Sequence, residues 1–226
     1  MHRSLADLRA PARTLIPMTF DGFPEAALDF YDDLEIDNSK VFWDAHKDTY
    51  RDSVATPMAA LCAGLAAEFG EAKAFRPYRD VRFSKDKTPY KTHQGAFVAV
   101  APATGYYIQI SAPGVRVAAG FYHAEADVLA AIRQAIDNNL FGPELEGILA
   151  TLAKSGWEIG GDQLKTAPRG WPKDHPRIEL LRHKSITVTK DYGFDPVIHK
   201  AALVDRVRKD WRQTRPFVDW ITTHTA

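Results

Sequence analysis

The sequence predicts an α+β fold, with an antiparallel β-meander sheet and helices both before and after it. Helical spacing of apolar residues dominates the first third of the chain, short alternating runs fill the middle, and helical spacing then returns. Because the alternating runs follow one another through short connections, we expect antiparallel neighbours and no βαβ units. The 226 residues can bury one continuous core, and we expect a loose tail over residues 1–18 and a single domain over residues 19–226.

Three helices are expected in the first third. Pro24 opens the first, and Ser39 has the residue type and position of an N-cap for the second. Thr56 and Pro57 are expected to restart the chain as the N-cap and first residue of a third helix, which Gly70 can end. Cys62 falls on the apolar stripe of that helix, so we interpret it as a packed residue and not as a nucleophile.

Alternating runs predict the strands of the sheet, since they are rich in β-branched and aromatic residues. The runs are residues 78–83, 94–100, 105–111 and 115–121. Between the last two, Pro113 and Gly114 favour a tight turn, because proline presets φ and glycine accepts the positive φ that follows.

Helical spacing returns over residues 125–137 and 143–154, and a long loop over residues 156–176 follows. Residues 185–189 alternate again and predict another strand. A final helix is expected after Asp195 and Pro196, with Pro216 kinking or interrupting it.

The overall charge excludes little by itself but limits the classes of partner. Lys and Arg together number 29 and so do Asp and Glu, which argues against a general nucleic-acid-binding or membrane-surface protein. The single cysteine permits no intrachain disulfide, which fits a reducing compartment. With no signal-peptide pattern and no apolar run of about 18 residues, we expect a cytoplasmic, soluble protein without a membrane partner. The sequence does not assign an oligomeric state.

The equal totals of acidic and basic residues hide segments of strong local charge. Residues 21–37 hold seven acids and no base, residues 73–91 hold seven bases against two acids, and residues 165–184 hold six bases against two. We call the last two the first and second basic blocks. If they converge in space, they form an anion site that the neutral total conceals.

The first basic block carries the densest polar chemistry. Arg79 and Arg82 offer planar bidentate donors, and Asp80 is the natural partner of a neighbouring arginine, so its pKa should fall. The loop that follows is dense in donors that can surround a phosphate or carboxylate, namely Lys85, Lys87, Tyr90 and Lys91 together with two hydroxyls. The alternative is a solvated hairpin whose lysines protect a sheet edge.

The same segment resembles a known family. Its residues 79–91, RDVRFSKDKTPYK, resemble the signature of the family catalogued as domain of unknown function 2461. Further support comes from residues 42–47 with Tyr50, 105–107, 164–165, 168–170 and 174–184. The resemblance implies a shared site and not a particular reaction. It also implies that Lys165, Arg169, His175 and Lys184 of the second basic block belong with the first.

Other catalytic motifs are absent from the sequence. It contains no phosphate-binding glycine loop, dinucleotide fingerprint, nucleophile elbow or H-E-x-x-H, so we expect no cofactor and no metal. His175 lies before Pro176, at an expected helix start where an anion could meet its imidazole and free amides, and the alternative is a residue that only packs.

Three functions remain open. The favoured one is an enzyme or binding protein for a phosphorylated or carboxylated small molecule. Its anion would be bound by Arg79, Arg82, Lys85, Lys87, Lys91, Lys165, Arg169 and Lys184, and its protons handled by Asp80, Tyr90 or His175, because cations lower the pKa of a neighbouring tyrosine or lysine. The second is a module that docks an acidic protein partner. A nucleic-acid-binding domain is the third, and the neutral charge counts against it.

Overall fold

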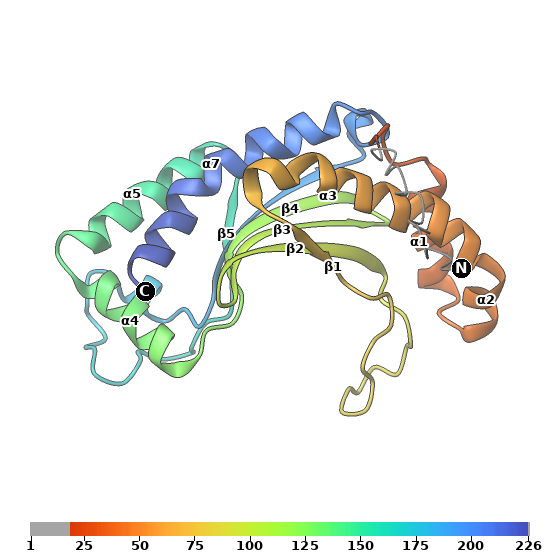
Figure 1. Ribbon diagram of the computed structural model, residues 1–226. Coiled ribbons are helices and arrows are strands. Elements are labelled where there is room, and N and C mark those ends of the chain that lie inside the picture. The colour runs from red at the N-terminus through yellow and green to blue at the C-terminus, as the bar shows by residue number, and fades with distance from the viewer. Residues whose placement is uncertain (1–18, 226) are drawn as a thin grey trace, which may run out of the picture.

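The structure, a computed structural model, describes residues 19–225, so the whole of the predicted tail over residues 1–18 lies outside the described residues. A six-stranded sheet with flanking helices confirms the predicted α+β fold (Figure 1). In chain order the elements are α1 (Ala26–Ile36), α2 (Lys40–Thr49), η1 (Tyr50–Ala55), α3 (Thr56–Phe69), β1 (Ala72–Ala74), β2 (His93–Ala101), β3 (Thr104–Ser111), β4 (Gly114–Phe121), α4 (Ala126–Asp137), α5 (Phe141–Lys154), β5 (Glu158–Gly160), α6 (Ile178–Leu181), β6 (Ile186–Gly193), η2 (Pro196–His199) and α7 (Leu203–Thr223). The strands are ordered β1-β2-β3-β4-β6-β5, and every neighbouring pair is antiparallel.

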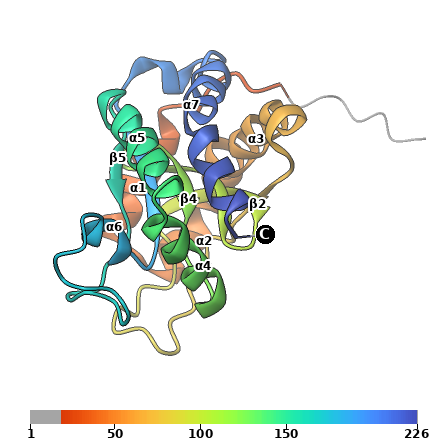
Figure 2. The same ribbon diagram turned by 90° about the vertical axis from the view of Figure 1, so that its left-hand side faces the viewer.

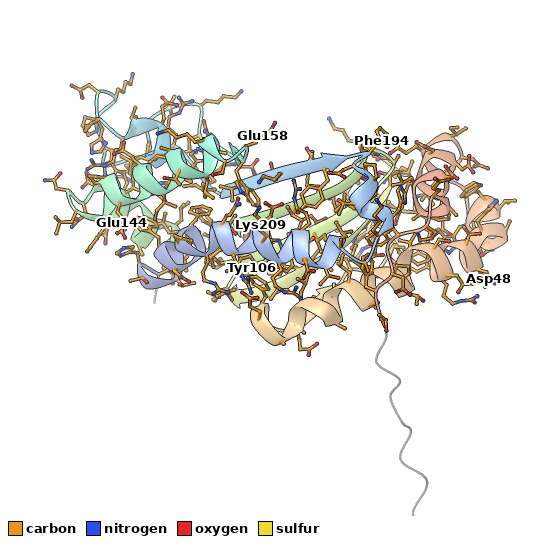
Figure 3. All side chains as sticks on the ribbon, turned by 90° about the horizontal axis from the view of Figure 1, so that it is seen from above. Asp48, Tyr106, Glu144, Glu158, Phe194 and Lys209 are labelled. Carbon is orange, nitrogen blue, oxygen red and sulfur yellow. The ribbon has the colours of Figure 1, made fainter. Side chains whose placement is uncertain are left out.

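One face of the sheet is covered by α3 and α7, which lie across it in Figure 3. Alternate residues of β3, including Tyr106 and Ile108, point toward these helices and are buried. The Tyr106 ring packs against Phe69 of α3 and Trp211 of α7, with ring centroids 5.0 and 5.3 Å away. This layer is the centre of a hydrophobic core that continues under α1, α4 and α5.

The opposite face of the sheet is concave and open (Figure 1). The segment 75–92 projects beside one end of the strands, and α4 with the connection 161–185 flanks the other end. This open face is where the fold leaves room for a site.

Helices α2 and α3 are joined into one continuous helical segment, where the sequence predicts a break. Ser39 caps α2, since its side chain accepts a hydrogen bond from the Phe42 amide, as expected. The expected restart at Thr56 is wrong, because π-helical residues Tyr50–Ala55 join α2 to α3 without a cap. Gly70, at φ 98°, ends α3 as predicted. Cys62 is partly buried against the core, and burial raises the pKa of its thiol to about 11.

Two further predictions about local structure are wrong. Residues 78–83 form no strand: the segment 75–92 is irregular and contains a single bridge, between Tyr78 and Tyr90. Helix α7 runs through Pro216 without interruption. Proline has no N–H to donate to the carbonyl of Arg212, one turn earlier in the helix. Both residues are exposed, so water can satisfy that carbonyl.

The later elements follow the predicted order with small additions. Helices α4 and α5 and strand β6 are where the spacing predicted them, whereas the three-residue strands β1 and β5 were not predicted. Within residues 19–225, no helix combines the length and apolar character needed to cross a membrane.

Candidate functional site

The stem of the segment 75–92 is held firmly on α2. The Tyr90 ring stacks on Trp43, with centroids 4.3 Å apart and planes 7° apart. The Asn38 amide group brackets the Tyr90 backbone, donating to its carbonyl (3.1 Å) and accepting from its amide (3.0 Å). A buried aromatic stack and two hydrogen bonds therefore fix the direction in which the segment leaves the body.

The outer part of this segment is held by its own ion pairs. Arg82 donates Nε and Nη2 to the two carboxylate oxygens of Asp80, at 2.9 and 2.7 Å. This confirms the predicted pairing, and hydrogen bonds from Arg82 lower the pKa of Asp80, as expected. Asp86 accepts from the Thr88 amide and hydroxyl and pairs with Arg79, which together lower its pKa to about 2.

The tip of the segment faces solvent. Phe83 is 96% exposed and Lys85 is exposed, while the Lys87 ammonium donates to the Val81 carbonyl at 2.9 Å. Of the predicted anion-binding residues here, Arg79, Arg82 and Lys87 thus already have partners within the segment.

The pKa values of Tyr90 and Lys91 are shifted in opposite directions. Burial raises the pKa of Tyr90, so the expectation that neighbouring cations lower it is wrong for this residue. Lys91 behaves as expected, because burial and the charge of Arg76 lower its pKa. His93, the first residue of β2, has its pKa lowered by burial and by Lys91 and Arg79.

The second basic block contributes mainly to the fold. His175 uses both ring nitrogens: Nε2 lies 2.9 Å from an Asp137 carboxylate oxygen and Nδ1 accepts from the Arg177 amide. Arg177 donates to the carbonyls of Ile136 and Asp137, which end α4. The helix that follows, α6, spans four residues and begins at Ile178, two residues beyond Pro176.

The remaining predicted residues of this block lie on the surface. Lys165 and Arg169 are exposed, and the Lys184 ammonium lies 4.0 Å from Asp162. Figure 2, viewed from this end of the molecule, has α4, α6 and the segment joining β5 to α6 in front of the segment 75–92.

The two basic blocks lie at opposite ends of the strands. The first leads into His93, which pairs with Ser111 beside the start of β4. The second leads into Ile186, which pairs with Phe121 at the end of β4. The eight residues of β4 therefore separate them, a distance of roughly 24 Å at about 3.4 Å per residue. The convergence on which one shared anion site depended does not occur.

A groove of about 510 Å³ lies on the open face of the sheet, within the roughly 300–1,000 Å³ usual for small-molecule sites. Its floor is made of small residues from neighbouring strands, Gly105, Ala118 and Gly120. Aromatic rings bound it: Phe97 and Tyr122 meet edge to face at 5.4 Å. Small floor residues between large rings leave room for a flat or apolar molecule.

Polar groups occupy one row across the groove. In register, Gly95 of β2 pairs with Gln109 of β3, which pairs with Arg116 of β4, which pairs with Asp191 of β6. Arg116 donates Nε and Nη2 to the Asp191 carboxylate (2.6 and 2.8 Å), and Tyr107 donates its hydroxyl to Gln109 (2.9 Å). Thr187 and Thr189 add hydroxyls from β6.

The first basic block meets the groove through Phe75. The Phe75 ring lines the groove 6.3 Å from the Tyr107 ring, and its carbonyl accepts a hydrogen bond from the buried Gln94 side chain at 2.8 Å. The Lys91 ammonium lies over the same ring, 5.3 Å from its centroid. Among residues 19–225 neither Lys91 nor Arg76 forms an ion pair with a carboxylate.

Sequence reasoning missed the groove, although it selected Lys91, which lies over one of the rings that line it. The signal available was the set of small residues at alternate positions of the predicted strands, such as Gly105 and Ala118, which cannot fill a sheet face. Within the described part of the chain, no three His, Cys, Asp or Glu side chains are placed to hold a metal ion.

Comparison with known proteins gives a family and nothing closer. No curated protein and no solved structure matches the chain. Residues 26–220 match the family described as Conserved hypothetical protein (DUF2461), a range that contains every strand, both flanks of the groove and the signature segment. The chain therefore belongs to the DUF2461 family of conserved hypothetical proteins.

Proposed function

We propose that this protein binds a small organic anion, a carboxylate or phosphate ester with a flat apolar body, in the groove on the open face of the sheet. The observation that carries the proposal is the position of Lys91, which has no ion pair with a carboxylate among residues 19–225 and whose ammonium lies over Phe75, a ring that lines the groove. The charge of Arg76 is near enough to lower the pKa of Lys91. Buried or crowded cations favour a negatively charged guest, because it removes their mutual repulsion.

The apolar part of the ligand would lie between the rings. Phe75 and Tyr107 form a tilted pair, and Phe97 and Tyr122 form an edge-to-face pair, over the glycine and alanine floor. Aromatic walls of this kind stack on flat ligands and remove apolar surface from water.

The charged part would lie toward Lys91, with Arg76 supplying longer-range attraction and His93 beside them. Arg116 and Gln109 lie in the polar row of the groove and can orient a second polar group, since the Nη1 atom of Arg116 has no hydrogen-bond partner among residues 19–225. Lys165, Arg169 and Lys184 have no part in this site, because they lie beyond the other end of the strands.

A second candidate is a module that docks an acidic protein through the segment 75–92. The observation in its favour is Phe83, which is 96% exposed beside the solvated Lys85. A partner that buried this phenylalanine would need neither the groove nor Lys91, so the two functions separate by mutation.

The test is a thermal-shift screen of the purified protein with aromatic carboxylates, phosphate esters and dicarboxylates, followed by calorimetric titration of any compound that stabilises it. Ala118→Leu fills the groove, and Ala130→Leu adds the same side chain on an exposed position of α4 as the matched control. Lys91→Gln removes the edge cation, and Lys154→Gln removes an exposed one on α5.

We expect Ala118→Leu and Lys91→Gln to abolish or strongly weaken binding while both controls retain it. Binding that survives Ala118→Leu would refute the groove. Binding of an acidic peptide that survives in Ala118→Leu but is lost in Phe83→Ser would support the docking module instead.

A further inference from the structure

Lys91 has surroundings that differ from those of the other partly buried or paired lysines in residues 19–225. Lys190 is paired with the Asp210 carboxylate at 3.0 Å, Lys184 faces Asp162, and Lys87 donates to a carbonyl. Lys91 instead packs its ammonium on the Phe75 ring, is partly buried, and lies near the positive charges of Arg76 and His93 when the latter is protonated. Partial burial and the charge of Arg76 stabilise the neutral amine relative to the ammonium.

A neutral lysine amine at the edge of a ligand groove is a nucleophile for carbonyl carbon. Desolvation and a neighbouring cation make a lysine more nucleophilic near neutral pH, and partial burial and the charge of Arg76 act in that direction at Lys91. A carboxylate or phosphate group of the ligand, bound in the same pocket, would hold the ligand's carbonyl group in place while the amine attacks.

His93 is positioned to handle the proton that such a reaction moves. It lies two residues after Lys91, and in β2 it shares a face with Gly95 and Phe97, which border the groove. Burial, Lys91 and Arg79 keep its pKa below the ordinary value of 6.5, so the neutral imidazole prevails at pH 7 and can accept a proton.

We propose that Lys91 forms a reversible imine with an aldehyde or ketone that also carries a carboxylate or phosphate. This inference rests on the proposed anion-binding function and names the class of ligand for that groove. The neutral amine of Lys91 attacks the carbonyl carbon, a C–N bond forms, and the carbonyl electron pair moves to oxygen, which takes a proton. The proton on oxygen comes from solvent, and nitrogen loses a proton to His93. His93 returns that proton to the new hydroxyl, which leaves as water as the C–O bond breaks, so that a protonated imine remains; addition of water reverses every step.

Reductive trapping tests the proposal directly. The intact protein is incubated with pyridoxal 5′-phosphate, which combines an aldehyde, a phosphate and a flat ring, and is then reduced with borohydride. Intact mass and peptide mapping report the site. We expect one label per chain, on Lys91, placed there faster than on the exposed Lys85 of the same segment, because a lowered pKa leaves a larger fraction of the amine neutral.

Lys91→Arg keeps the positive charge and removes the nucleophile, whereas Lys154→Arg makes the same change on an exposed position of α5. The fast label should vanish in the first variant and persist in the second. Labelling spread over exposed lysines, or fast labelling that persists in Lys91→Arg, would overturn the proposal.

Pyridoxine 5′-phosphate, which has the ring and the phosphate but no carbonyl, separates the two levels of inference. If it binds the groove by calorimetry and protects Lys91 from trapping, both proposals are supported. Groove binding of this compound together with no trapping at Lys91 refutes the imine and leaves the anion site standing. No binding of either compound to the wild-type protein, together with no Lys91 label, counts against imine formation with this class of ligand, and the anion screen then decides the groove by itself.

Discussion

The Tyr90 ring lies flat on the Trp43 indole, with centroids 4.3 Å apart and an angle of 7° between the planes. Trp43 belongs to α2 and Tyr90 closes the stem of the segment 75–92, so this stack links the first helices to the segment that carries the cations. The next residue, Lys91, reaches the groove through Phe75. The stack therefore sets where the charged edge of the site lies.

The stack predicts that Tyr90 acts through its ring and not through its hydroxyl, for which residues 19–225 supply no hydrogen-bond partner. Tyr90→Phe should change the free energy of unfolding by less than about 0.5 kcal/mol, and Tyr90→Ala should lower it by about 3 kcal/mol through loss of a buried ring. Urea denaturation measures both. Loss of ligand binding or trapping in a stably folded Tyr90→Phe protein would instead assign the hydroxyl a chemical role.

Asp210 of α7 has a buried carboxylate, so replacing it is expected to change the free energy of unfolding strongly. This side chain is 2% exposed and accepts hydrogen bonds from Lys190 (3.0 Å), Tyr192 (2.8 Å) and Arg206 (3.1 Å). Asp210→Asn removes the charge that these donors face, so we expect a loss of about 3 kcal/mol in the free energy of unfolding.

Asp205→Asn on the same helix is the control for Asp210. Asp205 is 80% exposed and pairs with Arg208, and such surface pairs contribute about 0–1 kcal/mol. Denaturation curves for the two variants that coincide would show that the Asp210 cluster does not stabilise the fold.

The sequence predicts the fold better than the site, for physical reasons. Strands β2, β3 and β4 alternate over eight or nine residues, which is long enough for period 2 to be visible. Strands β1 and β5 have three residues each, too few to show a period. The run from Tyr78 to Phe83 alternates as well, but the residues that follow it do not, and the segment pairs only at Tyr78 and Tyr90.

The site depends on register, which the sequence does not reveal. Gly95, Gln109 and Arg116 become neighbours only because β2, β3 and β4 pair in one particular alignment. The charge pattern selected Lys91 together with Lys165 and Arg169, because a basic composition does not say at which end of a sheet a residue lies. Arg177 and Arg182 belong to that second block and are used to bind backbone carbonyls.

His93 predicts a pH dependence with a definite sign. Its folded-state pKa lies below the unfolded value of 6.5, so just below pH 6.5 the unfolded chain binds more protons than the folded one. The stability that neutral His93 contributes is complete above pH 6.5 and decreases as the pH falls toward the folded-state pKa. A bound anion reverses this preference, so ligand affinity should rise as the pH falls from about 7.5 through 6.5.

Proton uptake on binding isolates His93 from His183, whose pKa is also lowered by burial. Titration calorimetry in buffers of different ionisation enthalpy should detect proton uptake near pH 6.5 in the wild-type protein and less in His93→Gln. Equal uptake in both proteins would place the titrating group elsewhere.

The second basic block predicts a separation of stability from binding at Arg177. Its guanidinium donates to the carbonyls of Ile136 (2.6 Å) and Asp137 (2.8 Å) at the end of α4, and it packs against Gly142, where a Cβ atom would come within 2.4 Å of its Nε. Arg177→Ala leaves these carbonyls without donors, so we expect it to lower the free energy of unfolding by about 1.5–3 kcal/mol. Arg169→Ala, at an exposed position of the same block, should change it by less than about 0.5 kcal/mol.

Calorimetric titration of Arg177→Ala and Arg169→Ala, at a temperature where both variants are folded, should give the wild-type affinity for the groove ligand. A selective loss of affinity in Arg169→Ala would mean that the two ends of the sheet share one ligand, which the separation along β4 argues against.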